Sequence, residues 1–253
     1  MPGSKLYFVT DAHLGAGTNS RQRESELCAL LDRMKCDASV VVFLGDIFDF
    51  WFSYRYVVPK GHIRLLGKMA ELSDAGIQLH YFIGNHDMWL FDYLPSEMNI
   101  IMHDEPDVLH FDGHSFLLGH GDGLGHLDKK YDFIRRIFRS RVNQRLFSWL
   151  PSGWTFGIAN AWSRSSRKKH IRENPKIFEY QGDDCEGIVI YCRQRLQNEH
   201  FDFCVFGHRH TPLVRDLGRS STYVNVGDWL MHRNYAVYHN GQIELNDLNQ
   251  IKN

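Results

Sequence analysis

A chain of 253 residues with 43% hydrophobic and 23% charged residues has the composition of a soluble globular protein, long enough to bury a substantial core. The formal net charge of −1 favours no partner of either charge. No apolar stretch reaches the roughly 18 residues that a membrane-spanning helix needs. The five cysteines form no CxxC pair, and residues 1–10 lack the apolar core of a signal peptide. We therefore expect a cytoplasmic protein with free thiols.

Short apolar runs of strand length alternate with longer stretches of helical periodicity. The runs predict strands at Lys5–Thr10, Ser39–Leu44, Ile77–Ile83, His114–Gly119, Phe201–Phe206, Ser221–Val226 and Asn234–His239. Apolar residues at helical spacing predict helices at Arg21–Lys35, His62–Ala75 and Glu186–Asn198. Because runs this continuous are typical of strands covered on both faces, we expect an α/β sheet fold.

The segment 126–176 differs in composition from the rest of the chain. It contains 13 Lys and Arg against three acidic residues, a local charge of +10 that leaves −11 for the remainder. It also holds three of the six tryptophans, Trp149, Trp154 and Trp162. We predict a single domain over residues 1–253, with a basic and aromatic helical cap inserted at 126–176.

Polar side chains follow each of the first five predicted strands. The sequences are FVTDAHLG, VVFLGDIFDFW, YFIGNHD, FLLGHGDGLGHLD and VFGHRHTP. Ligands of open α/β sheets bind outside the carboxyl ends of the strands, so we expect these residues to converge: Asp11, His13, Asp46, Asn85, His120, His208 and His210. A glycine precedes four of the clusters and lets the backbone approach whatever the side chains hold: Gly45, Gly84, Gly119 and Gly207.

These side chains form a donor set for metal ions. Carboxylates, an amide oxygen and imidazoles suit divalent ions such as Mn, Fe or Zn better than Ca²⁺. Seven donors are too many for one tetrahedral ion, but they suit two ions roughly 3.5–4 Å apart that share a carboxylate. Asp46 is the natural bridge. Any one motif alone could be an ordinary turn, whereas the whole set predicts a dinuclear metal centre.

The motifs DAH, GDIFD, GNHD, GHGD and GHRH resemble the five signature blocks of the calcineurin-like metallophosphoesterases, from Leu6 to about Asp228. The resemblance implies a β-sandwich of two sheets flanked by helices, and a dinuclear centre that hydrolyses phosphate esters or anhydrides. Mn²⁺ is the expected metal, with Fe and Zn as alternatives. One ion would be held by Asp11, His13, Asp46 and His210. The other would be held by Asp46, Asn85, His120 and His208.

Two such ions activate water and hold phosphoryl oxygens, so attack on phosphorus needs no protein nucleophile. We assign His86, which follows the ligand Asn85, to stabilising the transition state or protonating the leaving oxygen, with Asp87 orienting its ring. The alternative is a solvated loop histidine. Asp49 and Asp122 are candidates for orienting metal-bound histidines, with a turn role as the alternative. Among the other histidines, these match no ligand motif: His103, His110, His114, His126 and His232.

The stretch after His120, GDGLGHLDKKYDFIRR, resembles the UDP-2,3-diacylglucosamine pyrophosphohydrolases of lipid A biosynthesis. In that family an Asp, a Tyr and an Arg recur at this spacing. The later GIANAWSRSSRKKH resembles their second cap helix, which contacts the nucleotide lipid. The reaction implied gives lipid X and UMP. The substrate contacts implied are Asn85, His86, Asp128, Tyr131, Arg135, Ser166, Arg167, Lys169, His170 and His208.

The cap has the chemistry that such a nucleotide-linked glycolipid requires. A diphosphate with two acyl chains needs nearby cations and an apolar groove, and a basic, aromatic cap could supply both. Its apolar side could also rest on the anionic cytoplasmic face of the inner membrane, as in a peripheral protein. The alternative is that the apolar cap residues only pack onto the core: Phe133, Ile134, Ile137 and Phe138.

Two other functions stay open. The best-known members of the lipid family have Arg in place of His86, so GNHD keeps the general phosphoesterase form. A nucleotide or phospholipid phosphodiesterase or phosphatase is therefore the first alternative. The second is a nuclease or nucleic-acid-binding protein that uses the basic cap. The sequence contains no nucleic-acid-binding motif, so we expect no nucleic-acid partner. The oligomeric state is left open.

Overall fold

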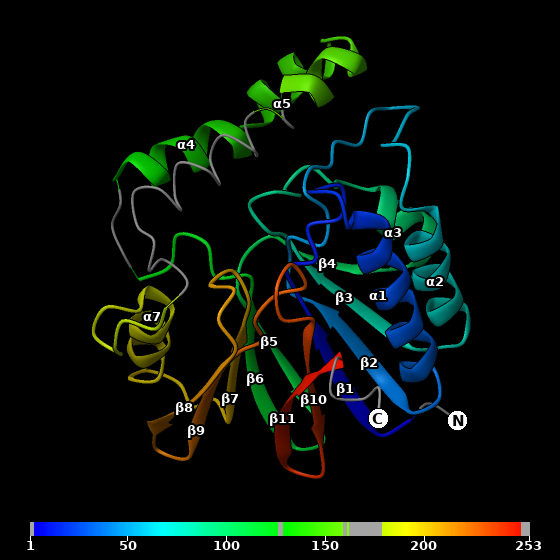
Figure 1. Ribbon diagram of the computed structural model, residues 1–253. Helices are drawn as coiled ribbons and strands as arrows, with labels where there is room; N and C mark the ends of the chain where they lie inside the picture. Colours follow the sequence, from blue (N-terminus) through cyan, green and yellow to red (C-terminus); the bar gives the residue numbers. More distant parts are fainter. Residues whose placement is uncertain (1–2, 126–128, 159–160, 162–178, 249–253) are drawn as a thin grey trace.

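The computed structural model describes residues 3–125, 129–158, 161 and 179–248 (Figure 1). Its centre is a pair of mixed β-sheets. The strand order of the first sheet is β11 (Gln242–Asp247), β10 (Asn234–His239), β1 (Lys5–Val9), β2 (Ala38–Phe43), β3 (Gln78–Phe82) and β4 (Ile101–His103). The order of the second is β5 (Asp107–Phe111), β6 (His114–Gly119), β7 (Phe203–Phe206), β9 (Ser221–Asn225) and β8 (Leu213–Gly218).

Helices cover the outer faces of both sheets, with α1 to α3 on one side and α7 on the other (Figure 1). Their bounds are α1 (Ser20–Met34), α2 (Ile63–Asp74), α3 (Tyr93–Met98) and α7 (Gly187–Arg195). The inserted segment is helical where the structure describes it, as α4 (Lys129–Arg139), α5 (Arg141–Ser148) and residues 152–158. In the described part of the chain, every helix is too short or too polar to cross a lipid bilayer.

The central strands are buried on both faces, which explains their continuous apolar sequences. In β1, Leu6 and Phe8 point into the core between the sheets, where they meet Phe116 of β6. Tyr7 and Val9 point the other way, into the core beneath α1 and α2. In β7 the same alternation occurs, and a third cluster of buried residues lies between this sheet and α7. The predicted α/β sandwich is therefore present.

All seven predicted strands and all three predicted helices are observed, with ends that shift by a few residues. The prediction missed β4, β5, β8 and β11, which are half-exposed and lie at or near the sheet edges. Sequences such as LVRDLG and QIELND contain no apolar run because an edge strand buries only part of its surface. The prediction also missed α3, whose sequence YLPSEM is short and contains a proline.

The helical cap contacts the core through aromatic side chains. The Trp89 indole N–H donates a hydrogen bond of 2.8 Å to the backbone carbonyl of Phe138. The Phe147 ring lies 4.7 Å from Trp89 and 5.0 Å from Phe52, measured between ring centroids. Trp89 comes four residues after Asn85 in the sequence, so the cap is joined directly to the loop after β3.

Candidate metal centre

The predicted ligands lie in the loops that follow the carboxyl ends of parallel strands in both sheets. Strands β1, β2 and β3 run parallel, as do β6 and β7. The loops that follow them therefore leave each sheet at the same end of its strands. All seven predicted ligands are brought together there: Asp11 and His13 after β1, Asp46 after β2, Asn85 after β3, His120 after β6, and His208 and His210 after β7.

The first half of the cluster is formed by Asp11, His13, His210 and Asp46. Asp11 Oδ1 lies 3.1 Å from His210 Nε2 and 3.6 Å from His13 Nε2. The two imidazoles meet with their Nε2 atoms 3.3 Å apart, and His13 Nε2 is 3.8 Å from Asp46 Oδ2. Two imidazole nitrogens at this distance require a proton or a cation between them.

The second half of the cluster is formed around His120. Its Nε2 atom lies 3.4 Å from Asp46 Oδ2, 3.3 Å from Asn85 Oδ1 and 3.2 Å from His208 Nδ1. Asp46 Oδ2 therefore lies near imidazole donors of both halves, as a bridging carboxylate would. Donor atoms of Asp11, Asp46 and His120 all lie within 4.8 Å of one another, as do those of Asp11, His13 and His210.

The two carboxylates offer one oxygen each to the cluster. Asp11 Oδ2 accepts hydrogen bonds from the Thr10 hydroxyl (2.6 Å) and the His208 backbone N–H (2.8 Å), and Asp46 Oδ1 accepts one from the His86 backbone N–H (2.8 Å). The other oxygens face imidazole nitrogens in a site where Asp11 is fully buried. Buried anionic oxygens combined with imidazole and amide donors fit a divalent cation of the Mn, Fe or Zn type.

The backbone of the ligand loops is strained. Five of the seven predicted ligands have left-handed φ angles, between 42° and 67°: Asp11, His13, Asp46, His208 and His210. Such conformations are uncommon for residues other than glycine and persist where the surrounding structure enforces them. Gly84 and Gly207 allow the close approach, because a Cβ at Gly84 would overlap Asp46 Oδ1 and one at Gly207 would overlap the Thr10 hydroxyl. The predicted need for glycine at these two positions is confirmed.

Three histidines are oriented by partners behind the cluster. His120 Nδ1 lies 2.8 Å from the Leu44 carbonyl, and His210 Nδ1 lies 3.0 Å from Asp228 Oδ2. His13 Nδ1 is 3.5 Å from Asp49 Oδ1, so the predicted orienting role fits Asp49. With Nδ1 occupied, each ring turns Nε2 toward the cluster, which fixes its tautomer for metal binding.

A profile of the calcineurin-like phosphoesterases matches residues 4–212 of the chain. The chain belongs to the calcineurin-like phosphoesterase family. It is 35% identical to a protein named UDP-2,3-diacylglucosamine hydrolase from Porphyromonas gingivalis, covering 98% of this chain and 99% of the relative. It is 26% identical to a protein of the same name from Ralstonia nicotianae, covering 88% and 83%. A solved phosphoesterase from E. coli aligns with TM-score 0.48 and 15% identity, covering 97% and 94%.

The predicted family, fold class and type of chemistry are confirmed by these matches: the chain is a metal-dependent phosphohydrolase. Calcineurin-like phosphoesterases use a dinuclear metal centre, and the two halves of the cluster are the groups that could hold it.

Charge is balanced within the centre of this phosphoesterase. Although burial opposes their ionisation, the imidazolium groups of His210 and His120 hold the pKa of Asp11 and of Asp46 below the usual range. Burial likewise disfavours charged imidazoles, yet Asp11 raises the pKa of His210 to about 10 and Asp46 raises that of His120. Burial and the charge on His120 lower the pKa of His208 to about 4. The buried carboxylates thus draw positive charge into the site, a role that a divalent cation would take over from the imidazole protons when it binds.

Asp228 is a functional residue that the sequence prediction missed. It is buried, and besides His210 it accepts hydrogen bonds from the backbone N–H groups of Met231 and His232 and lies 3.1 Å from His232 Nδ1. A signal was present, because Asp228 follows a strand and a glycine, as Asp46 does.

Replacing Asp228 by Asn is expected to weaken metal binding about 10- to 100-fold, as loss of such a histidine partner typically does. The Asn oxygen can keep the backbone hydrogen bonds, but its NH₂ group would face His210 Nδ1 and favour the tautomer with Nε2 protonated. Competition with a chelating indicator measures the affinity. His232→Gln is the matched control, expected within about threefold of wild type since His232 is half-exposed. Equal metal affinity in Asp228→Asn and wild type would contradict this role.

Arg23 is a second residue that sequence reasoning missed. It is a buried arginine of α1, and its guanidinium donates hydrogen bonds to the carbonyl oxygens of Ala12 (3.1 Å), His13 (3.0 Å) and Ala16 (2.6 Å). It therefore holds the loop that carries Asp11 and His13 in its strained conformation. An arginine within an amphipathic helix gives no sequence signal of this role.

In the GNHD loop, the observed partners of Asp87 differ from the predicted one, the His86 ring. Asp87 is buried and accepts hydrogen bonds from the backbone N–H groups of Gly84 (3.0 Å) and Phe48 (3.3 Å) and from the Tyr81 hydroxyl, so it fastens the loop instead of orienting His86. The His86 ring is held by Asp49, with its Nδ1 3.0 Å from the Asp49 carbonyl. Burial lowers the pKa of His86, whereas burial and the Asp46 charge raise the pKa of Asp87 to about 6.

His86 is also more exposed to solvent than the most buried of the predicted ligands. Its side chain is 20% exposed, whereas those of His13, Asp46 and His120 are at most 3% exposed. Its ring packs edge-on against His13 at 4.7 Å between centroids. A group of this kind can contact a substrate that lies on the metal centre.

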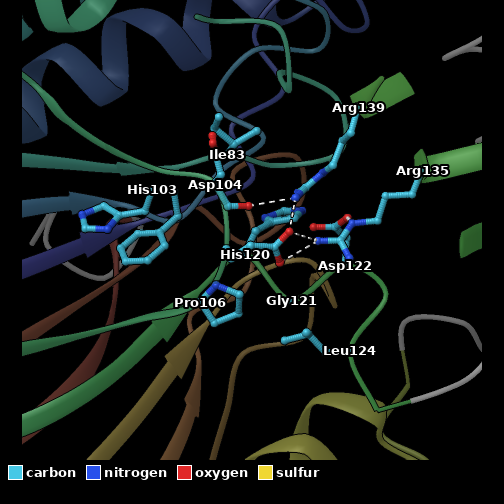
Figure 2. Close-up of a pocket in the computed structure, with 12 residues that line it drawn as sticks. Ile83, His103, Asp104, Pro106, His120, Gly121, Asp122, Leu124, Arg135 and Arg139 are labelled. Carbon is cyan, nitrogen blue, oxygen red and sulfur yellow. Dashed lines mark hydrogen bonds and ion pairs between the residues drawn. The ribbon is translucent and has the colours of Figure 1, made fainter. Parts of the chain in front are cut away.

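Arg135 is the described member of the predicted substrate contacts on the cap. Its guanidinium faces core carboxylates, with Nη2 3.0 Å from Glu105 and Nε 3.4 Å from Asp122 (Figure 2). Asp122, predicted to orient a metal-bound histidine, therefore has a cap arginine as a partner. The predicted contacts Asp128, Ser166, Arg167, Lys169 and His170 lie outside the described residues, as does the side chain of Tyr131.

Proposed function

We propose that this phosphoesterase cleaves the pyrophosphate of UDP-2,3-diacylglucosamine and releases lipid X and UMP. The observation that carries the proposal is the similarity to a relative named for this substrate, which extends over 98% of the chain and so includes the cap. A similarity restricted to the sandwich would support only the reaction type. The most economical explanation of a shared cap is a shared substrate.

In this proposal, one metal ion is held by Asp11, His13, Asp46 and His210, and the other by Asp46, Asn85, His120 and His208. Mn²⁺ is the proposed ion, with Fe and Zn as alternatives. Two such ions, when bound, lower the pKa of water and neutralise charge on phosphoryl oxygens. The chain itself contributes orientation, because Asp228, Asp49 and the Leu44 carbonyl hold three ligand imidazoles in the tautomer that binds metal.

The exposed ring of His86 is proposed to act on the phosphoryl group or on the leaving oxygen, with Asn85 and His208 beside it at the substrate. Its Nδ1 is held by the Asp49 carbonyl, so Nε2 remains for the substrate. Asp87 supports this role from behind by fixing the loop through Gly84 and Tyr81. Both residues thus serve catalysis in this proposal, although only His86 touches the substrate.

The acyl chains are proposed to lie along the aromatic side chains between cap and core. Phe52, Trp89 and Phe147 form a continuous cluster there, and the ring of Phe156 lies 5.2 Å from Phe50. Aromatic walls of this kind bind apolar chains, while a few polar groups fix the orientation of the head group. The nucleotide contacts proposed from the resemblance remain Asp128, Tyr131, Ser166, Arg167, Lys169 and His170.

The cap is also proposed to rest on the cytoplasmic face of the inner membrane, where the substrate lies. Three large apolar cap residues are exposed, Phe133 at 64%, Trp149 at 75% and Trp154 at 71%, and the exposed Arg136 and Arg141 lie between the first two in the sequence. An amphipathic, basic surface of this kind binds anionic bilayers. Cosedimentation with phosphatidylglycerol vesicles should fall when Trp149 and Trp154 are both replaced by Ser. Equal recovery of both proteins with the vesicles would refute the contact.

Steady-state assays with Mn²⁺ test the substrate. We expect kcat/KM for UDP-2,3-diacylglucosamine to exceed that for UDP-N-acetylglucosamine and for bis(4-nitrophenyl) phosphate by at least about a hundredfold, since neither small substrate reaches the aromatic cluster. Equal turnover of the small substrates would favour a phosphoesterase of other specificity, as the GNHD motif allows. Degradation of nucleic acid in preference to the lipid would favour the nuclease alternative.

A further inference from the structure

Two arginines of α4 reach from the cap to one core carboxylate, Glu105. Arg135 Nη2 lies 3.0 Å from Glu105 Oε2, and Arg139 Nη1 contacts Glu105 Oε1 and donates a hydrogen bond of 2.9 Å to the Asp104 carbonyl. The two arginines are four residues apart, so they project from the same face of the helix. Figure 2 shows both side chains crossing toward Asp104 and Asp122 beside the ligand His120.

The chain at Glu105 is anchored on both sides, although its side chain is 60% exposed. It lies in the short connection between β4 of the first sheet and β5 of the second. On one side of Glu105, the ring of His103 stacks on Phe82 at 4.3 Å, and its Nδ1 lies 3.0 Å from Asp107 on the other side. The connection is thus fixed at both ends, and it can hold a cap helix at a defined height.

A third contact joins the same helix to the metal loop. Arg135 Nε lies 3.4 Å from Asp122 Oδ2, and Asp122 follows the ligand His120 by two residues with a side chain only 5% exposed. A small cavity lies between α4 and the metal loop. The residues that line it include the metal-ligand candidate His120, the core carboxylate Glu105 and the two cap arginines. These ion pairs join α4 to the core beside the centre, together with the hydrogen bond from Trp89 to the Phe138 carbonyl.

We propose that Glu105 is a positioning residue, which holds α4 through Arg135 and Arg139 at the distance from the metal centre that a large capped substrate requires. The proposal rests on the proposed function for its substrate. It assigns Arg135 to placing the cap, whereas the family resemblance implies a direct contact with substrate.

The two roles predict opposite effects of removing Glu105. If Arg135 binds a substrate phosphate, Glu105 competes for it, and Glu105→Ala would lower KM. If Glu105 positions the cap, Glu105→Ala and Arg135→Gln both raise KM for the lipid substrate. Because the two residues then act through one contact, their effects would not multiply in the double variant.

The experiment is a double-mutant cycle with Mn²⁺-loaded protein. We expect each single variant to raise KM for UDP-2,3-diacylglucosamine by about three- to tenfold, the size of effect of partly exposed ion pairs. The double variant should stay within about twofold of the larger single effect, and turnover of bis(4-nitrophenyl) phosphate by Glu105→Ala should stay within about twofold of wild type. Arg145→Gln is the control, an exposed arginine of the neighbouring cap helix α5, expected to match wild type. A lowered or unchanged KM in Glu105→Ala, or effects that multiply, would overturn the proposal.

A second measurement does not depend on the substrate. Hydrogen exchange of the amides in 129–148 should be at least about threefold faster in Glu105→Ala than in wild type, since the open state of the cap becomes more populated. Unchanged exchange would overturn the positioning role even if another substrate were found. Conversely, faster exchange in a protein that does not hydrolyse the lipid would refute the proposed function and retain the role of Glu105.

Discussion

Replacing Asp46 by Ala is expected to lower kcat by at least a thousandfold and to reduce the metal content of the purified protein. Asp46 Oδ2 lies near imidazole donors of both halves of the centre, 3.4 Å from His120 Nε2 and 3.8 Å from His13 Nε2. A thousandfold loss corresponds to about 4 kcal/mol of transition-state stabilisation, a modest part of what a two-metal clamp supplies. Steady-state kinetics with saturating Mn²⁺ and elemental analysis measure the two effects.

Two controls separate loss of the centre from loss of the fold. Asp202→Ala removes a carboxylate at the far end of the second sheet, where Asp202 bonds Ser115, and it should retain metal and kcat. Asp46→Asn keeps the shape of the side chain and its hydrogen bond to the His86 N–H, so a folded but inactive protein is expected. Activity of Asp46→Ala within about tenfold of wild type would refute the bridging role.

For His86→Ala we expect full metal content and a fall in kcat of about 10²- to 10⁴-fold, the range of contributions from a positioned acid or base. His86 is more exposed than the buried ligands and is held from behind by Asp49, which suits contact with substrate. Kinetics and elemental analysis on the same preparation are the measurement. Loss of metal would instead make His86 a ligand, since its donor atom and those of His13 and Asp46 lie within 4.8 Å of one another.

A series of phosphodiesters with different leaving groups distinguishes the two roles considered for His86. If the imidazole protonates the leaving oxygen, the deficit of His86→Ala grows as the leaving group becomes more basic, and it nearly vanishes for 4-nitrophenol. If the ring stabilises charge on the phosphoryl oxygens, the deficit is the same across the series. His239→Ala serves as a control, because the half-exposed His239 contacts Ser4 at the opposite end of the first sheet from the cluster.

The sequence by itself determined the central strands and the seven residues of the cluster. Both follow from local rules. A strand buried on both faces must be apolar throughout, as LYFV in β1 and VVVF in β2 are. Parallel strands deliver their carboxyl ends to one edge, so polar residues directly after them meet without any knowledge of the sheet order. Strands β8 and β11 were missed by the prediction because an edge strand does not need a continuous apolar run.

Only the tertiary structure decided which side chains support the cluster. Asp87 follows His86 in the chain but turns to Tyr81 and Gly84, and Asp49, 37 positions away, holds the imidazole instead. Arg23 and Asp228 likewise act on loops that are distant in sequence. Neighbouring side chains in a tight loop point in different directions, so adjacency in the chain does not predict contact. The side chains that contact a metal-ligand candidate from behind come from separate strands and helices. Their identity depends on how these elements pack, and that packing is a property of the whole fold.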